Sequence, residues 1–91
     1  MKIVLNRCYG GFSVSKFAVS ALDLEDEYSE VSRTNEYLIS LIESEGSNAI
    51  SGHFAKLEVV NIPDEITDYE IIDYDGIEEV IYVLDGKLYH A

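Results

Sequence analysis

One cysteine and two histidines are the candidates for a thiol nucleophile and an imidazole base in this chain. Cys8 would need a cation or a base beside it to react as a thiolate, and only Arg7 is adjacent in sequence. A phosphatase-like loop would require an arginine where Val14 stands, and no spacing places His53 or His90 near the thiol. We therefore expect Cys8 to be a bystander, and we expect no catalytic residue and no enzymatic activity.

A second candidate for chemistry is the segment Asp73-Tyr74-Asp75-Gly76, which brings two carboxylates and a glycine together as calcium loops do. It lacks the ligand at the next alternate position and the downstream bidentate glutamate of an EF-hand. Paired carboxylates suited to glycoside hydrolysis carry little information in so acidic a chain. We therefore interpret the segment as a turn, and expect neither a metal nor another cofactor.

The segment from Gly10 to Lys16 resembles, in outline, the strand, glycine turn and helix that hold a phosphate. The P-loop spacing GxxxxGK[ST] is absent, so a tight turn between strand and helix is the favoured interpretation. The alternative function that it leaves open is a small-molecule or nucleotide-signal binding protein, a sponge. Its ligand residues would be Gly10, Gly11, Ser13 and Lys16.

Carboxylates dominate the chain, because 18 Asp and Glu face six Lys and Arg and leave a formal net charge of −12. Direct binding of nucleic acid or of an anionic membrane needs Lys and Arg, so both become poor partners, and basic protein surfaces become good ones. One acidic block, residues 23–30, has few apolar neighbours and predicts a loop. The other, residues 64–85, alternates with Ile, Val and Tyr and predicts ordered structure.

Ordered carboxylates beside tyrosines form a surface suited to an arginine-rich partner, through ion pairs and stacking on the rings. We therefore expect the second block to bind a host protein that has a basic surface. The candidate contact residues are Asp64, Glu65, Asp68, Tyr69, Glu70, Asp73, Tyr74, Asp75, Glu78 and Glu79.

The sequence pattern predicts the elements that must position these residues. They form one α+β domain over residues 1–91, with two helices packed on one face of a mainly antiparallel sheet of about four strands. Helices are expected over residues 14–22, capped by Ser13 or Ser15, and from a cap at Thr34 or Asn35 to Gly46. A further helical turn is an option within residues 47–52. Strands are expected at residues 2–6, 54–62, 67–74 and 80–84, the last forming a hairpin with 87–89. Residues 77–83 also fit helical spacing, and the hairpin is favoured.

No segment has the roughly 18 apolar residues of a membrane span or the layout of a signal peptide, and a single cysteine suits a reducing compartment. These features predict a cytosolic protein. The sequence leaves open whether it is a monomer or a homodimer.

Five separated stretches, which cover about half the chain, resemble a family of small bacteriophage and prophage proteins to which no reaction is assigned. They are KIVLN at residues 2–6, CYGGFS at 8–13, GHFAKLEVV at 52–60, IPD at 62–64 and DYDGI at 73–77. The first two, a KIVxNxCYGGFS-type motif, are the most specific. The resemblance implies a phage setting, in which small acidic proteins commonly block host defence or regulatory machinery. Together with the charge, it predicts an inhibitor of anti-CRISPR type that acts in the bacterial cytoplasm by mimicking nucleic acid.

Overall fold

The protein is an α+β domain of three helices and five strands, as seen in a computed structural model that describes residues 1–91. The elements are β1 (Lys2–Asn6), α1 (Lys16–Ala21), α2 (Glu36–Glu45), α3 (Ser47–Ile50), β2 (Leu57–Asn61), β3 (Asp68–Tyr74), β4 (Ile77–Leu84) and β5 (Lys87–His90). The predicted class is confirmed. The strands, five instead of about four, form two antiparallel sheets, β1–β2 and β3–β4–β5.

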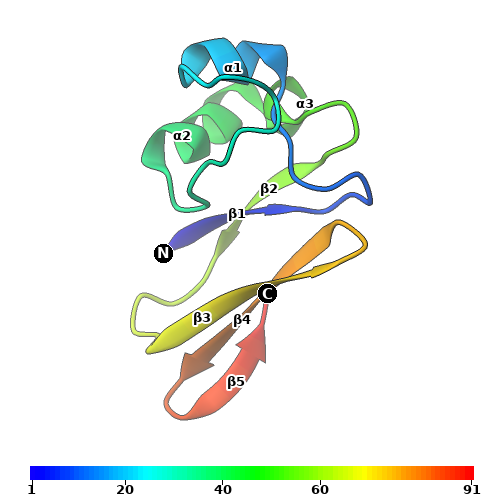
Figure 1. Cartoon of the computed structure of the whole chain (residues 1–91). Helices are drawn as coiled ribbons and strands as arrows, with labels where there is room; N and C mark the ends of the chain where they lie inside the picture. Colours follow the sequence, from blue (N-terminus) through cyan, green and yellow to red (C-terminus); the bar gives the residue numbers. More distant parts are fainter.

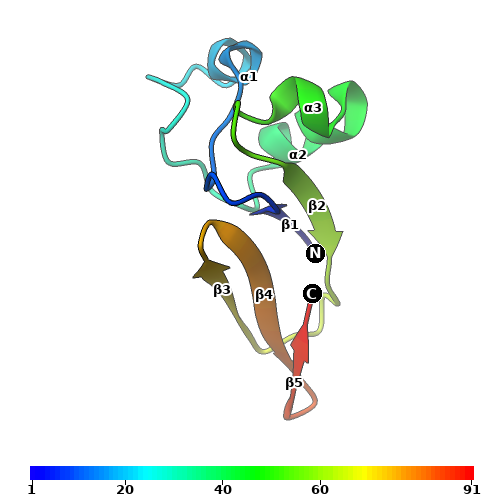
Figure 2. The ribbon, with the colours of Figure 1, turned by 90° about the vertical axis from the view of Figure 1, so that its right-hand side faces the viewer.

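The molecule has three layers, with the β1–β2 sheet between the helices and the three-stranded sheet (Figures 1 and 2). β1 is buried on both faces: Val4 packs among the helices, and Ile3 and Leu5 pack against Val80 of β4. A strand covered on both sides needs an unbroken apolar run, and residues 3–5 are one. The prediction of one sheet with the helices on one face was wrong in this respect. Because β1 takes this central position, the strands form two stacked sheets.

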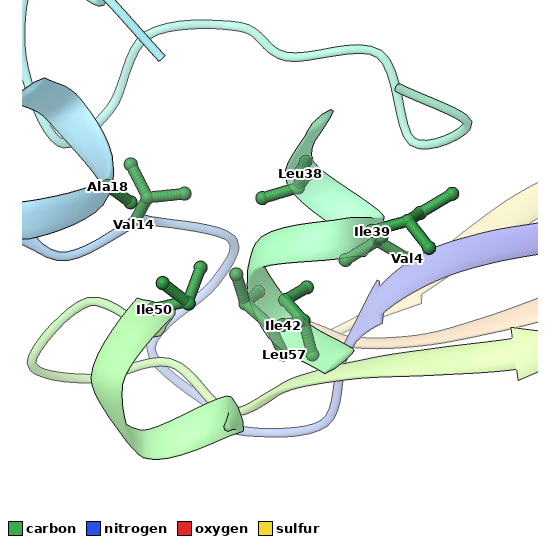
Figure 3. Packing of buried hydrophobic residues seen from close by; sticks show 8 residues of the cluster. All are labelled: Val4, Val14, Ala18, Leu38, Ile39, Ile42, Ile50 and Leu57. Carbon is green, nitrogen blue, oxygen red and sulfur yellow. The ribbon is translucent and has the colours of Figure 1, made fainter. Parts of the chain in front are cut away.

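In each long helix one of the two expected caps is used, and α1 is shorter than expected, Lys16–Ala21 instead of residues 14–22. The Ser15 hydroxyl accepts from the Ala18 N–H at 3.2 Å, and the Asn35 side chain accepts from the Leu38 N–H at 3.0 Å. Gly46, at φ 92°, ends α2 and leads directly into α3, the further helical turn. The buried side chains of this layer meet those of β1 and β2 in one cluster of eight residues (Figure 3).

Two hairpins build the three-stranded sheet. Their turns, Asp75-Gly76 and Asp85-Gly86, have positive φ at both residues, which matches the right-handed twist of the flanking strands. Residues 77–84 are therefore a strand, and the helical alternative is wrong. The acidic block at residues 23–30 is a loop, as predicted.

Candidate protein-binding surface

Most of the predicted contact residues lie on the three-stranded sheet, but its register divides them between two faces. Residues directly opposite each other on antiparallel strands point to the same side, and neighbours along a strand point to opposite sides. The face turned away from β1–β2, called the outward face below, holds Asp68, Glu70, Tyr74 and Glu79. The face turned toward β1–β2 holds Tyr69, Asp73 and Glu78. Asp64, Glu65 and Asp75 lie in turns at the two ends of β3.

The outward face is not covered by any other part of the chain. In Figure 1 the helices and the β1–β2 sheet all lie on one side of the three-stranded sheet, and only β1 makes extensive contact with it. The apolar side chains of this face are Ile72, Ile77, Ile81, Val83 and Leu88. Leu88 is 68% exposed and Ile72 is 38% exposed. The outward face therefore combines an apolar centre with carboxylates.

Few of its carboxylates are neutralised within the chain. Glu79 is hydrogen-bonded to the imidazole of His90 on β5, and Asp64, in the turn before β3, forms an ion pair with the N-terminal amine. Asp68 and Glu70 form no ion pair, and the Asp68 carboxylate accepts only the N–H of Tyr69 at 2.9 Å. These two side chains hold unpaired negative charge on a hydrogen-bonded strand, where position and spacing are fixed.

Glu78 cannot belong to such a surface, and its inclusion was wrong. It is 4% exposed, because its side chain points between the layers. Its carboxylate receives a two-pronged ion pair from Arg33, one arm of which measures 2.8 Å, and accepts the Asn6 N–H at 2.7 Å. The Arg33 guanidinium also lies 3.9 Å from the centre of the Phe12 ring. Glu78 thus joins the loop before α2, strand β1 and strand β4.

For the alternative anion-binding interpretation of the Gly10 to Lys16 segment, the structure places Ser13 and Lys16 at one open pocket of about 360 Å³ but uses the nearby backbone amides within the fold. The amides that would hold an anion are engaged: Val14 N–H donates to Glu27 O at 3.0 Å, and Ser15 N–H donates to Ile50 O at 2.8 Å. Ser13 is 5% exposed, and its side chain packs against Gly52. Gly10 lies against the Phe54 backbone, where any side chain would collide. Lys16 is exposed, and Gly11 serves the turn at φ 83°.

Neither imidazole is aligned with Cys8. The His53 ring packs edge-on against Phe54 with centroids 4.5 Å apart, and His90 pairs with Glu79. Cys8 is half-buried. No group of three or more His, Cys, Asp or Glu side chains is arranged to hold a metal ion.

Sequence reasoning missed the apolar half of the outward face, because the isoleucines and valines that alternate with carboxylates in residues 64–85 indicated only ordered structure. A signal was available in β4, where residues 80–84 are apolar at every position and so present apolar side chains on both faces. A chain of 91 residues has few elements left to cover a second face.

Comparison with known proteins adds no relative, since no family model, curated protein or solved structure matches this chain. The phage resemblance therefore stays a prediction. None of the helices is long and apolar enough to cross a membrane.

Proposed function

We propose that this protein is an inhibitor that binds a basic, nucleic-acid-binding surface of a host protein and so keeps nucleic acid away from it. The observation that supports the proposal is the outward face, where Asp68 and Glu70 hold unpaired charge on a hydrogen-bonded strand that also carries Tyr74 on the same face, at its other end. The phage-type motif at residues 2–13 supports a viral origin, and an anti-CRISPR or similar anti-defence protein is the most concrete form. It would act in the bacterial cytoplasm.

Rigid carboxylates suit this role for two reasons. A net charge of −12 attracts a basic partner over a long range and raises the association rate. Side chains on a strand keep their spacing, so they lose less conformational freedom on binding than carboxylates in a loop. Nucleic acid itself would not be bound, because few cations are free to neutralise its phosphates.

The test is capture of a partner from a bacterial host lysate by the immobilised protein, followed by a nucleic-acid binding assay on what is captured. The wild type is compared with two variants of equal charge change, Asp68→Lys/Glu70→Lys on the sheet and Glu25→Lys/Glu30→Lys in the loop. We expect the wild type and the loop variant to retain the partner and to release labelled nucleic acid from it, and the sheet variant to do neither. Equal capture by all three, or capture that leaves nucleic acid bound, would overturn the proposal.

A further inference from the structure

We infer that the outward face is a docking site for arginine side chains of a partner protein, and that its apolar floor contributes to binding together with its charge. This inference rests on the proposed function in one respect, namely that the partner is a basic protein. It adds the contribution of the apolar floor and the kind of side chain that the partner inserts.

The outward face has a shallow hollow of about 80 Å³. Its floor is apolar, formed by Ile81 and Val83 of β4 and Leu88 of β5. Asp68 and Glu70 of β3 stand at its side, where register places them opposite Val83 and Ile81. An apolar floor with carboxylates at one edge matches a side chain that has an aliphatic stem and a cationic end.

Arginine fits these features better than lysine. Its planar guanidinium donates to two acceptors at once and is more weakly hydrated than an ammonium group, so it loses less solvation when it reaches the carboxylates. Arginine is also among the residues that supply most of the binding energy at protein interfaces.

A second groove of about 240 Å³ lies at the opposite end of the β3–β4 hairpin and reaches from the outward face round the edge of the sheet. Ile72 and Ile77 are its apolar wall, and its carboxylates are Asp73, which lies on the inward side, and Glu79, which also contacts His90. Tyr74, 81% exposed, and Tyr9, 73% exposed, add rings on which a guanidinium can stack. Arg7 also lines this groove; its guanidinium donates to the Glu78 carbonyl at 2.7 Å, and its Nε lies 3.9 Å from the Glu58 carboxylate, which offsets part of its charge. A partner with two separated arginines would occupy both places.

A second copy of this chain is a poor occupant of the same face. Two outward faces in contact would bring Asp68, Glu70 and their counterparts together, and each chain carries a net charge of −12. Like charges brought together in an interface cost several kcal/mol. The charge of the face therefore favours a basic partner over self-association.

The test is a titration of the ¹⁵N-labelled full chain, followed by NMR, with an eight-residue capped peptide that contains two arginines and two leucines. Three matched peptides replace both arginines with lysine, both arginines with the neutral isostere citrulline, or both leucines with serine. We expect amide shifts centred on residues 68–70, 81–83 and 88, binding at least about tenfold weaker with citrulline, and about threefold weaker with lysine or serine. Shifts centred on residues 23–30, or equal binding of the citrulline peptide, would overturn the inference.

Protein variants complete the test. Glu70→Gln and Leu88→Ser change exposed side chains on the outward face, and Glu25→Gln and Tyr37→Ser are matched exposed controls in the loop and on α2. The first pair should weaken binding of the arginine peptide about fivefold, and the controls should leave it unchanged. An unchanged affinity for Leu88→Ser would exclude the apolar contribution. Because the peptide assay needs no host protein, its result is independent of whether the captured partner binds nucleic acid.

Discussion

At the scale of single residues, the contact that most clearly depends on the three-dimensional structure is the ion pair between Arg33 and Glu78. The two residues are 45 positions apart, and Glu78 has carboxylates as neighbours in sequence at Glu79 and Asp75. Nothing in its local pattern separates it from the exposed acids, so the sequence could not show that it is buried. Its place on the inward side of β4, next to β1, decides its role.

The substitution Glu78→Gln should therefore destabilise the fold, because it leaves the Arg33 guanidinium between the layers without its counter-ion. We expect a loss of about 2–3 kcal/mol in the free energy of unfolding, measured by urea denaturation, since removing one member of a buried pair strands the other charge. Glu79→Gln, which removes the half-exposed partner of His90, is the control, with a loss of at most about 1 kcal/mol. Equal losses would contradict the role assigned to Glu78.

At the scale of elements, much of the structure could be predicted from local signals. Ser15 and Asn35 identify the starts of α1 and α2, and the two Asp-Gly pairs identify the hairpins. These signals depend on backbone chemistry within a few residues. The separation into two sheets could not be predicted, because it depends on which strands stack and not on which residues form strands.

The turn between β3 and β4 gives a test of this stacking. Gly76 and Gly86 occupy equivalent turn positions at φ 91° and 76°, but a methyl group at Gly76 would collide with the Tyr9 carbonyl and the Gly11 N–H. Nothing lies within 4 Å of the corresponding position at Gly86.

Gly86→Ala should therefore cost only the strain of a left-handed alanine, about 1 kcal/mol, and Gly76→Ala about 3 kcal/mol, because the turn must also move away from the Tyr9 loop. Thermal and urea unfolding of both variants would measure the difference. If the two substitutions proved equally costly, the contact between this turn and the residue 9–11 loop would not stabilise the fold.

At the scale of the whole molecule, the two acidic blocks lie on different parts of the three-layer structure. The loop at residues 23–30 accompanies the helices, and β3 and β4 lie at the opposite side (Figure 1). The sequence could identify both blocks and predict which one is a loop and which one lies on strands. It could not show that carboxylates of the ordered block share one face of the sheet with an uncovered apolar surface, since that depends on how the sheets stack.

Self-repulsion at a net charge of −12 should make the stability of the protein depend on salt. We expect the melting temperature to rise by several degrees between about 10 mM and 500 mM sodium chloride, as salt screens the carboxylates. The Glu25→Lys/Glu30→Lys variant should show a smaller rise. A melting temperature that falls with added salt would show that attractive ion pairs dominate the charge balance.

The central claim is that fixed carboxylates on the outward face, and not the total charge, bind the partner. Its most direct test is the dissociation constant of the captured host protein, measured at several salt concentrations for the wild type and the two lysine double variants. We predict steep weakening with salt for the wild type, near-wild-type binding for Glu25→Lys/Glu30→Lys, and a loss of at least about tenfold for Asp68→Lys/Glu70→Lys. Equal weakening by both variants would show that only net charge matters and would contradict the account.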